Sequence, residues 1–406
     1  MGLERLNVLI SSGHNLCYDK FNNQKGENMP DSFTETTKIS YGKNIKNSFI
    51  GALLGIILFL ASFVILWLNE GNNVNQIYKA NYMEKNAVEI SADKISRDND
   101  NKLVQLSGKA ITDATLTDGI VSIKDVFALK RNVEMYQWKE NVKTESKDEL
   151  GGSTTQTKTY SYEKVWSGYE INSEEFKKSG YVNPKFPVKS EDFYADKGTL
   201  GKFNLTSKQI NAMSEYSKYT NLPYRYEYKI FEGSYYKGKD PLNPSIGDIR
   251  ITYNYVPSGV NISIIAQQKS DDTLTNMTIK KGSVYLQQSG LKTKDEMINS
   301  FRKGNQIFTN IIRIAGWLCM FIGMTLLISP LVVIFKVIPF LQKIVGFLTS
   351  GVLFLISLAL SLLTIAIAWL AYRPLLSIGL IIVICGIIFI IKTKFKPAQE
   401  YPQQEE

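Results

Sequence analysis

Cysteine and histidine are scarce in this chain of 406 residues, which has three cysteines, Cys17, Cys319 and Cys385, and one histidine, His14. None of them lies in the long polar stretch at 70–306. That stretch therefore cannot form disulfides, a thiolate or imidazole metal site, or a Cys/His or Ser/His catalytic pair. Carboxylates, lysine, tyrosine and serine are the candidate catalytic groups that remain there.

Charge is absent from four long stretches, and this excludes a soluble protein. The stretches are Asn47–Asn69, Ile314–Phe335, Ile344–Tyr372 and Pro374–Ile391. Each is close to or above the roughly 18 to 20 apolar residues that a helix needs to cross about 30 Å of hydrocarbon. We therefore predict four transmembrane spans, at 47–69, 314–335, 344–372 and 374–391.

Clustered basic charge is also missing from the polar stretch. The chain has a formal net charge of +9, but residues 70–306 carry 34 Lys and Arg against 30 Asp and Glu, with the two signs interspersed. Nucleic-acid binding would require basic residues gathered on one face. We therefore expect no nucleic-acid partner.

Lysines mark one side of the predicted membrane. They precede the first span, lie between the second and third, and follow the fourth: Lys38, Lys43, Lys46, Lys336, Lys343, Lys392, Lys394 and Lys396. Such flanks face the cytosol. This predicts a cytosolic N-terminal segment at 1–46, a lumenal or extracytosolic domain at 70–306 and a cytosolic tail at 392–406. Residues 1–30 lack the apolar run of a cleaved signal peptide, and either Met1 or Met29 is the start.

The 70–306 domain shows mostly strand patterns. Polar and apolar residues alternate at 224–228 and 249–255, and shorter alternations occur at 103–106, 260–265 and 284–286. Helical candidates are Ser207–Tyr219 and Lys294–Phe308, and Glu145–Lys158, with its two adjacent glycines, is typical of a mobile loop. The predicted fold class is a multi-pass α-helical membrane protein with a large α+β, strand-rich extramembrane domain between spans one and two.

Several segments carry a resemblance to a known family. They include Trp67-Leu68-Asn69-Glu70-Gly71, Val133-Glu134-Met135-Tyr136-Gln137-Trp138-Lys139-Glu140, Ala315-Gly316-Trp317 and Ala368-Trp369-Leu370-Ala371-Tyr372-Arg373-Pro374-Leu375. In this order and over residues 31–391, the chain resembles the transmembrane protein 43 (LUMA) family. The resemblance implies a scaffold of the endoplasmic reticulum and inner nuclear membrane that self-associates and holds nuclear-envelope proteins such as emerin and lamins. The family has bacterial members, so a bacterial chain would lie in the plasma or inner membrane. The resemblance carries over no catalytic residue.

Some polar residues have two interpretations each. Arg313 and Arg373 border spans, which favours anchoring to lipid headgroups over an ion pathway. Glu134, Glu140 and Asp248 could form an acid/base pair, but salt-bridged or solvated strand residues are the favoured interpretation. We predict no catalytic, cofactor-binding or metal-binding residue. The predicted lumenal domain also has three glycosylation sequons, at Asn204, Asn261 and Asn276.

Small residues in the spans suggest how the chain could associate. Gly51 and Gly55 form a GxxxG face on span one, which either packs against a neighbouring span or dimerises. We locate self-association in the membrane part, on this face and a second one at Gly346, Ser350 and Gly351.

The predicted function is a non-enzymatic membrane scaffold that contacts membrane lipids, forms a homo-oligomer and maintains nuclear-envelope structure. The alternative is a channel or lipid-handling protein formed by the C-terminal spans. Scattered hydroxyl side chains could line its path: Thr325, Ser329, Thr349, Ser350, Ser357, Ser361, Thr364 and Ser377. The organism, the direct partners and the oligomer number do not follow from the sequence.

Overall fold

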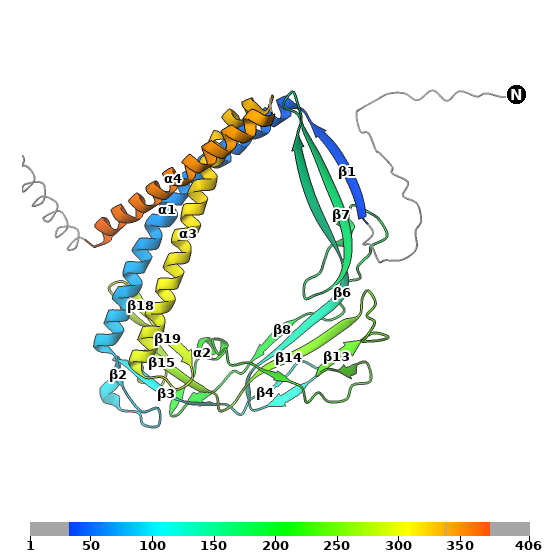
Figure 1. Cartoon of the computed structure of the whole chain (residues 1–406). Helices are drawn as coiled ribbons and strands as arrows, with labels where there is room; N and C mark the ends of the chain where they lie inside the picture. Colours follow the sequence, from blue (N-terminus) through cyan, green and yellow to red (C-terminus); the bar gives the residue numbers. More distant parts are fainter. Residues whose placement is uncertain (1–31, 338, 374–406) are drawn as a thin grey trace, which may run out of the picture.

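The computed structural model describes residues 32–337 and 339–373, which form an open frame (Figure 1). A bundle of long helices forms one side of the frame, and a narrow three-stranded ribbon forms the other side. The two sides meet at an apex, and β-sheets join them at the base. The large strand-rich domain predicted from the sequence is therefore confirmed.

Three helices of the described residues are long and apolar enough to cross a membrane. They are α1 (Tyr41–Asn86), α3 (Lys294–Ile334) and α4 (Pro339–Tyr372), with Thr349–Tyr372 as the apolar part of α4. They contain the first three predicted spans. The predicted span at 374–391 lies outside the described residues, as do 1–31 and the tail at 392–406, so the count of four stays a prediction.

The helices α1 and α3 continue beyond the membrane into the domain. α1 runs on to Asn86, and α3 already begins at Lys294, behind a capping box formed by Thr293 and Glu296. Their extramembrane turns bury Ala80, Met83, Met297 and Ile298 against strand residues of the base. The bundle and the domain therefore share a hydrophobic cluster, beside two further clusters within the domain.

Two large sheets contain most of the strands of the base and of the ribbon. The eight-stranded sheet contains β1 (Ser32–Ile39), β7 (Thr154–Ser167), β6 (Val126–Asp148), β14 (Ile249–Pro257), β13 (Ser234–Lys237) and β12 (Lys229–Phe231), with β8 (Glu191–Tyr194) and β11 (Ser217–Tyr219) beside them. The seven-stranded sheet contains β10 (Phe203–Asn204), β9 (Thr199–Leu200), β3 (Leu103–Ile111), β15 (Asn261–Gln268) and β16 (Leu274–Thr275), with β2 (Val88–Glu89) and β19 (Leu286–Ser289). Short elements complete the described residues: β4 (Thr115–Thr117), β5 (Ser122–Lys124), β17 (Met277–Ile279), β18 (Gly282–Val284), α2 (Ser207–Asn211), η1 (Arg97–Asn99), η2 (Ser173–Glu175) and η3 (Phe335–Val337).

Two of the predicted local structures are wrong. Residues 224–228 are not a strand, and Tyr224 and Tyr226 are largely exposed, because no neighbouring strand pairs with them. The predicted helix Ser207–Tyr219 is helical only to Asn211 and ends in strand β11.

The predicted mobile loop at 145–158 is also wrong, because it is the end of a long hairpin. β6 pairs with β14 through its first part, and from Met135 to Asp148 it pairs with β7. Gly151 and Gly152 make the turn with φ of 85° and 83°, a conformation that glycine adopts without strain. Strand β1 adds to the outer edge of β7, from Ser32 opposite Ser161 to Ile39 opposite Thr154. We call β1, β7 and residues 136–148 of β6 the ribbon.

The ribbon touches the bundle at its far end (Figure 1). The Nδ2 of Asn44, in the first turns of α1, donates to the Gly152 carbonyl and to Thr154 Oγ1, both at 2.9 Å. The Gly151 N–H donates to the Val337 carbonyl at 3.1 Å, in the link between α3 and α4. The hairpin tip is therefore held against the end of the bundle opposite the base.

This pairing bears on the predicted sides of the membrane. Strand β1 belongs to the segment 1–46 predicted as cytosolic, whereas its partner β7 belongs to the domain 70–306 predicted as lumenal. The boundaries and sides stay predictions. Any assignment of sides must allow the ribbon to reach the level of the first turns of α1, where its tip contacts Asn44.

Candidate membrane-interface site

A buried ion pair joins the helices at the level where their apolar runs end. Glu70 of α1 is fully buried, and both of its carboxylate oxygens accept from Arg313 of α3, at 2.7 and 2.8 Å. The indole N–H of Trp369, in α4, donates to the same carboxylate at 2.6 Å. One acidic side chain therefore ties together all three long helices.

The positions of these residues follow from the apolar runs. Glu70 ends the run of α1, Arg313 precedes the run of α3, and Trp369 lies near the end of α4. α3 runs antiparallel to α1, and α4 runs parallel to α1. All three positions therefore fall at one level of the bundle (Figure 1). At this level Arg373 stacks on the Trp369 ring, with its guanidinium carbon 4.7 Å from the ring centroid.

The bidentate geometry makes this pair sensitive to substitution. Removing one partner of a buried ion pair typically costs about 3 to 5 kcal/mol, because the other charge is left without compensation. Glu70 was not recognised as a site residue from the sequence, although an acidic residue directly at the end of an apolar run is the signal that could have found it.

A cavity of about 430 Å³ opens beside the ion pair. Its walls contain three arginines, Arg302, Arg313 and Arg373, together with Trp369 and Thr309. Five amide side chains complete its polar lining: Asn73, Gln76, Asn305, Gln306 and Asn310. Among the described residues, no carboxylate lines this cavity. The surface that the cavity presents is therefore rich in hydrogen-bond donors.

The two arginines singled out in the sequence come together here. Arg313 and Arg373 both line the cavity, at the height where the apolar parts of the helices end. This position is consistent with the predicted contact to lipid headgroups.

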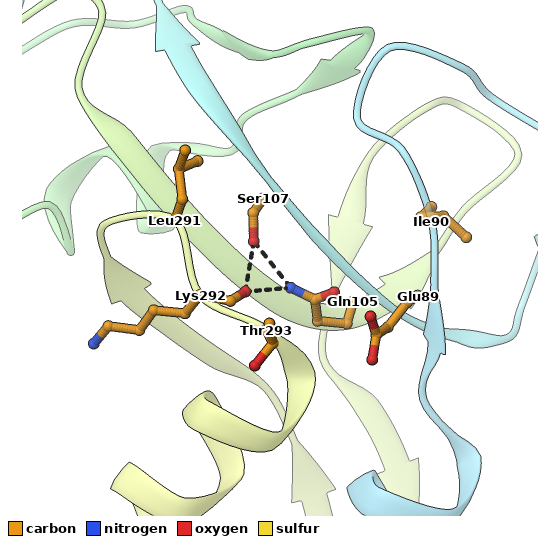
Figure 2. A pocket seen from close by; sticks show the side chains of 7 residues that line it. All are labelled: Glu89, Ile90, Gln105, Ser107, Leu291, Lys292 and Thr293. Carbon is orange, nitrogen blue, oxygen red and sulfur yellow. Dashed lines mark hydrogen bonds between the residues drawn. The ribbon is translucent and has the colours of Figure 1, made fainter.

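A second cavity of about 430 Å³ lies at the start of α3 (Figure 2). There the Gln105 amide and the Ser107 hydroxyl donate to the Lys292 carbonyl at 2.9 and 2.8 Å. Ser263 Oγ lies 2.7 Å from Ser107 Oγ and accepts from the Lys292 N–H at 2.8 Å. These serines hold the turn that precedes the helix, so their contacts explain a structural role.

The carboxylates considered for acid/base work are each engaged in the domain. Glu134 pairs with Arg250 at 2.6 Å. Glu140 accepts from the Tyr162 hydroxyl at 2.6 Å and from the Lys177 N–H at 2.7 Å. Asp248 accepts from the Tyr236 hydroxyl and from the Ser245 N–H. The interpretation as a salt-bridged strand residue therefore fits Glu134, whereas Glu140 of β6 is held by neutral donors and Asp248 lies just before β14.

Five of the hydroxyl side chains singled out in the spans bond to their own helices, and one of them, Ser329, also donates to the Ser48 carbonyl of α1 at 3.3 Å. Donation to a carbonyl three or four residues earlier is seen at Thr325, Ser329, Ser357, Ser361 and Thr364. Ser357 also accepts from the Trp317 indole at 3.2 Å. A single copy therefore offers no support for a polar path along these residues.

Comparisons with known proteins agree with this architecture. A family model described as Transmembrane protein 43 matches residues 135–374. Transmembrane protein 43 of Mus musculus and of Homo sapiens are each 28% identical to the chain over 344 residues, which is 80% of this chain and 85% of either relative. The Transmembrane protein 43 homolog of Drosophila melanogaster is 26% identical over 311 residues, or 74% of this chain and 83% of the relative. No solved structure matches the chain. Since the family model covers more than half of the sequence, this membrane protein belongs to the transmembrane protein 43 family.

Proposed function

We propose that this protein is a multi-pass membrane scaffold, whose activity is binding and assembly rather than catalysis. The observation that carries the proposal is the continuity of α1 and α3, which run from the apolar part of the bundle into the domain core at Ala80, Met83, Met297 and Ile298. A domain attached in this way keeps a set orientation on the membrane, as a scaffold requires. In a eukaryote we place it in the endoplasmic reticulum and inner nuclear membrane, where it would hold proteins such as emerin and lamins. In a bacterium we place it in the inner membrane.

Self-association is part of this proposal, but the first of the two faces suggested by the sequence is not available for it. The GxxxG face of α1 is occupied within the chain: a Cβ on Gly55 would lie 2.7 Å from the Gly323 carbonyl oxygen of α3. Intrachain packing, the first of the two interpretations, is therefore the one the structure supports for this face.

The ribbon supplies a better surface for self-association. Its outer strands, β1 and the distal part of β6, each have one edge without a neighbouring strand among the described residues. Its tip reaches the first turns of α1, so the ribbon covers the same height as the apolar part of the bundle, on the other side of the frame. Unpaired backbone groups at that level require protein or water around them.

A second copy is the partner that fits these edges. Both edges carry similar polar residues, and copies in one membrane share one orientation, which aligns β1 of one copy parallel to β6 of the next. Because one edge belongs to β1 and the other to β6, such contacts run head to tail and can close into a ring.

Cysteine cross-linking of the full chain in its native membrane tests this arrangement. Thr36 and Glu145 both lie opposite Thr157, on its two sides, so β7 separates them within one chain. Two strand spacings amount to roughly 9.6 Å, beyond the ~7 Å over which Cα atoms can be bridged by a disulfide. In a chain whose native cysteines are replaced, Thr36→Cys combined with Glu145→Cys should therefore form disulfides only between copies, and give a ladder longer than dimers.

Matched variants sharpen this test. Lys143→Cys and Lys147→Cys, which point to the same face as Glu145, cover a small shift in register. Each single-cysteine variant should form dimers at most, because one cysteine per copy can form only one disulfide. Thr36→Cys is thus combined in turn with a cysteine at 143, 145 or 147. If all three double variants remain monomeric under oxidation while the protein stays folded and inserted, the edge-to-edge model is wrong.

A specific observation also supports the lipid-handling alternative. The interface cavity is lined by cationic and amide side chains at the boundary of the apolar helices. This feature is compatible with a scaffold, and it leads to the inference that follows.

A further inference from the structure

The interface cavity has the chemistry of an anion site. Arg302, Arg313 and Arg373 approach it from α3 and from the end of α4, and no carboxylate is among the described residues that line it. Arginine presents planar pairs of N–H donors that match phosphate and carboxylate oxygens. An anion in the cavity would meet donors on several sides.

Acidic side chains outside the cavity lining orient two of these arginines. Glu70 holds Arg313 through Nε and Nη2, and Arg313 Nη1 donates to Asn310 at 3.1 Å. Glu84 holds Arg302 through both terminal nitrogens, at 3.2 and 2.7 Å. Because a guanidinium has five N–H donors, these contacts position the arginines and leave further donors for a ligand.

A buried hydroxyl in the cavity wall provides independent evidence. Thr309 is 2% exposed, and its Oγ1 makes no hydrogen bond in the structure. Leaving a buried polar group unsatisfied costs free energy, so such groups are uncommon without a reason. A bound ligand that bonds to this hydroxyl would supply the reason.

The surroundings of the cavity indicate the kind of ligand. It lies at the level where the apolar parts of α1, α3 and α4 end. Large apolar side chains remain exposed around it, including Ile307 at 62% and Phe308 at 53%. An anionic group here would be attached to, or lie next to, hydrocarbon chains.

We propose that this cavity binds the phosphate group of a membrane lipid headgroup. Arg302, Arg313 and Arg373 surround the phosphate oxygens, Thr309 donates to one of them, and the acyl chains extend along the exposed apolar side of the bundle. This site does not depend on self-association, so the cross-linking result leaves it unaffected.

Native mass spectrometry of the full-length protein, released from detergent micelles, tests the site. The probes are dioctanoyl phosphatidic acid and inorganic phosphate, titrated separately. The wild-type protein should retain phosphatidic acid. Arg373→Gln should weaken this binding about tenfold, as expected for the loss of a charge-assisted contact. Retention of inorganic phosphate at similar concentrations would support the site with free phosphate as its ligand.

Thr309→Val separates binding from folding. Valine keeps the shape of threonine and removes a hydroxyl that has no partner in the unliganded protein, so the thermal unfolding midpoint should not fall. Phosphatidic acid binding should weaken about fivefold. If the hydroxyl had a purely structural role, the unfolding midpoint of Thr309→Val would fall and its phosphatidic acid binding would stay unchanged.

Arg250→Gln is the matched control. Arg250 stacks on Trp166 at 4.6 Å in the domain, much as Arg373 stacks on Trp369, but it lies outside the cavity. Binding by this variant should stay within about twofold of wild type, since no proposed contact is lost. The proposal fails if wild-type protein retains neither probe, or if Arg373→Gln and Arg250→Gln bind alike.

Discussion

At the scale of single residues, the domain contains a second buried ion pair. The Asp118 carboxylate accepts from the backbone N–H groups of Ile120 and Val121, from the Tyr253 hydroxyl at 2.7 Å and from Arg131 at 2.9 Å. Burial acts to raise the pKa of Asp118. These hydrogen bonds outweigh that effect and hold the pKa below its usual value.

We expect Asp118→Asn to destabilise the domain by about 3 to 5 kcal/mol at neutral pH, because the half-exposed Glu191 would be the only carboxylate left to compensate the Arg131 charge. A depressed carboxyl pKa stabilises the fold above the unfolded value of about 3.9, and this contribution disappears as pH falls through the lower folded value. The wild type should therefore lose stability below about pH 3.9, and the variant should lack that part of the decline.

Thermal unfolding of the full-length protein in detergent, at pH 7 and pH 3, measures this effect. Asp192→Asn is the control, since Asp192 pairs with Lys130 on the surface and should contribute at most about 1 kcal/mol. Equal unfolding midpoints for the wild type and Asp118→Asn at pH 7 would contradict the prediction.

At the scale of elements, the packing of α1 against α3 depends on close approach of their backbones. A Cβ on Gly55 would lie 2.7 Å from the Gly323 carbonyl oxygen and 2.8 Å from the Leu327 nitrogen, and backbone atoms cannot move aside cheaply. A Cβ on Gly51 meets only side-chain atoms at 3.8 Å. The helix packing therefore requires glycine at 55 but leaves room for a Cβ at 51.

Alanine at each position should show this difference. We expect Gly55→Ala to cost about 1 to 3 kcal/mol through overpacking, and Gly51→Ala to be nearly neutral. Gly351→Ala on α4 serves as a second control, because nothing lies within 4 Å of its added Cβ. Thermal midpoints of the three purified variants provide the comparison. A stable Gly55→Ala protein would show that α1 and α3 are less tightly packed than in the structure.

At the scale of the whole molecule, the sequons report which side of the membrane the domain occupies. Asn276 is exposed between β16 and β17, and Asn204 is exposed in β10. Asn261 lies within β15 with its side-chain oxygen buried, and Ser263 of the same sequon is fully buried and donates to the Gly290 carbonyl. A glycan on Asn261 would therefore disturb the seven-stranded sheet.

If the domain is lumenal in a eukaryotic host, the folded protein should carry glycans on Asn276 and Asn204 and none on Asn261. Mobility shifts after endoglycosidase treatment, compared among Asn→Gln variants of each site, provide the measurement. A glycan confined to Asn261 would contradict the sheet. Complete absence of glycans in a host that modifies a control sequon would contradict the lumenal placement.

The sequence predicted well whatever depends on local composition. The three apolar stretches within the described residues are helical, and the alternation at 249–255 is strand β14. Prediction failed where partners distant in the chain decide the outcome. The alternation at 224–228 finds no pairing strand, whereas the glycine-containing segment 145–158 pairs with itself and with β1.

The sequence by itself therefore determined that this is a membrane protein with a large strand-rich domain, and it pointed to the family. These properties follow from apolar length, residue alternation and motif order, which are all local. Only the tertiary structure decided that Gly55 faces α3, that Glu70 joins Arg313 and Trp369, and that β1 closes onto the hairpin. The physical reason is that burial and hydrogen bonding pair residues hundreds of positions apart, and no local pattern of the chain encodes which partner each residue will meet.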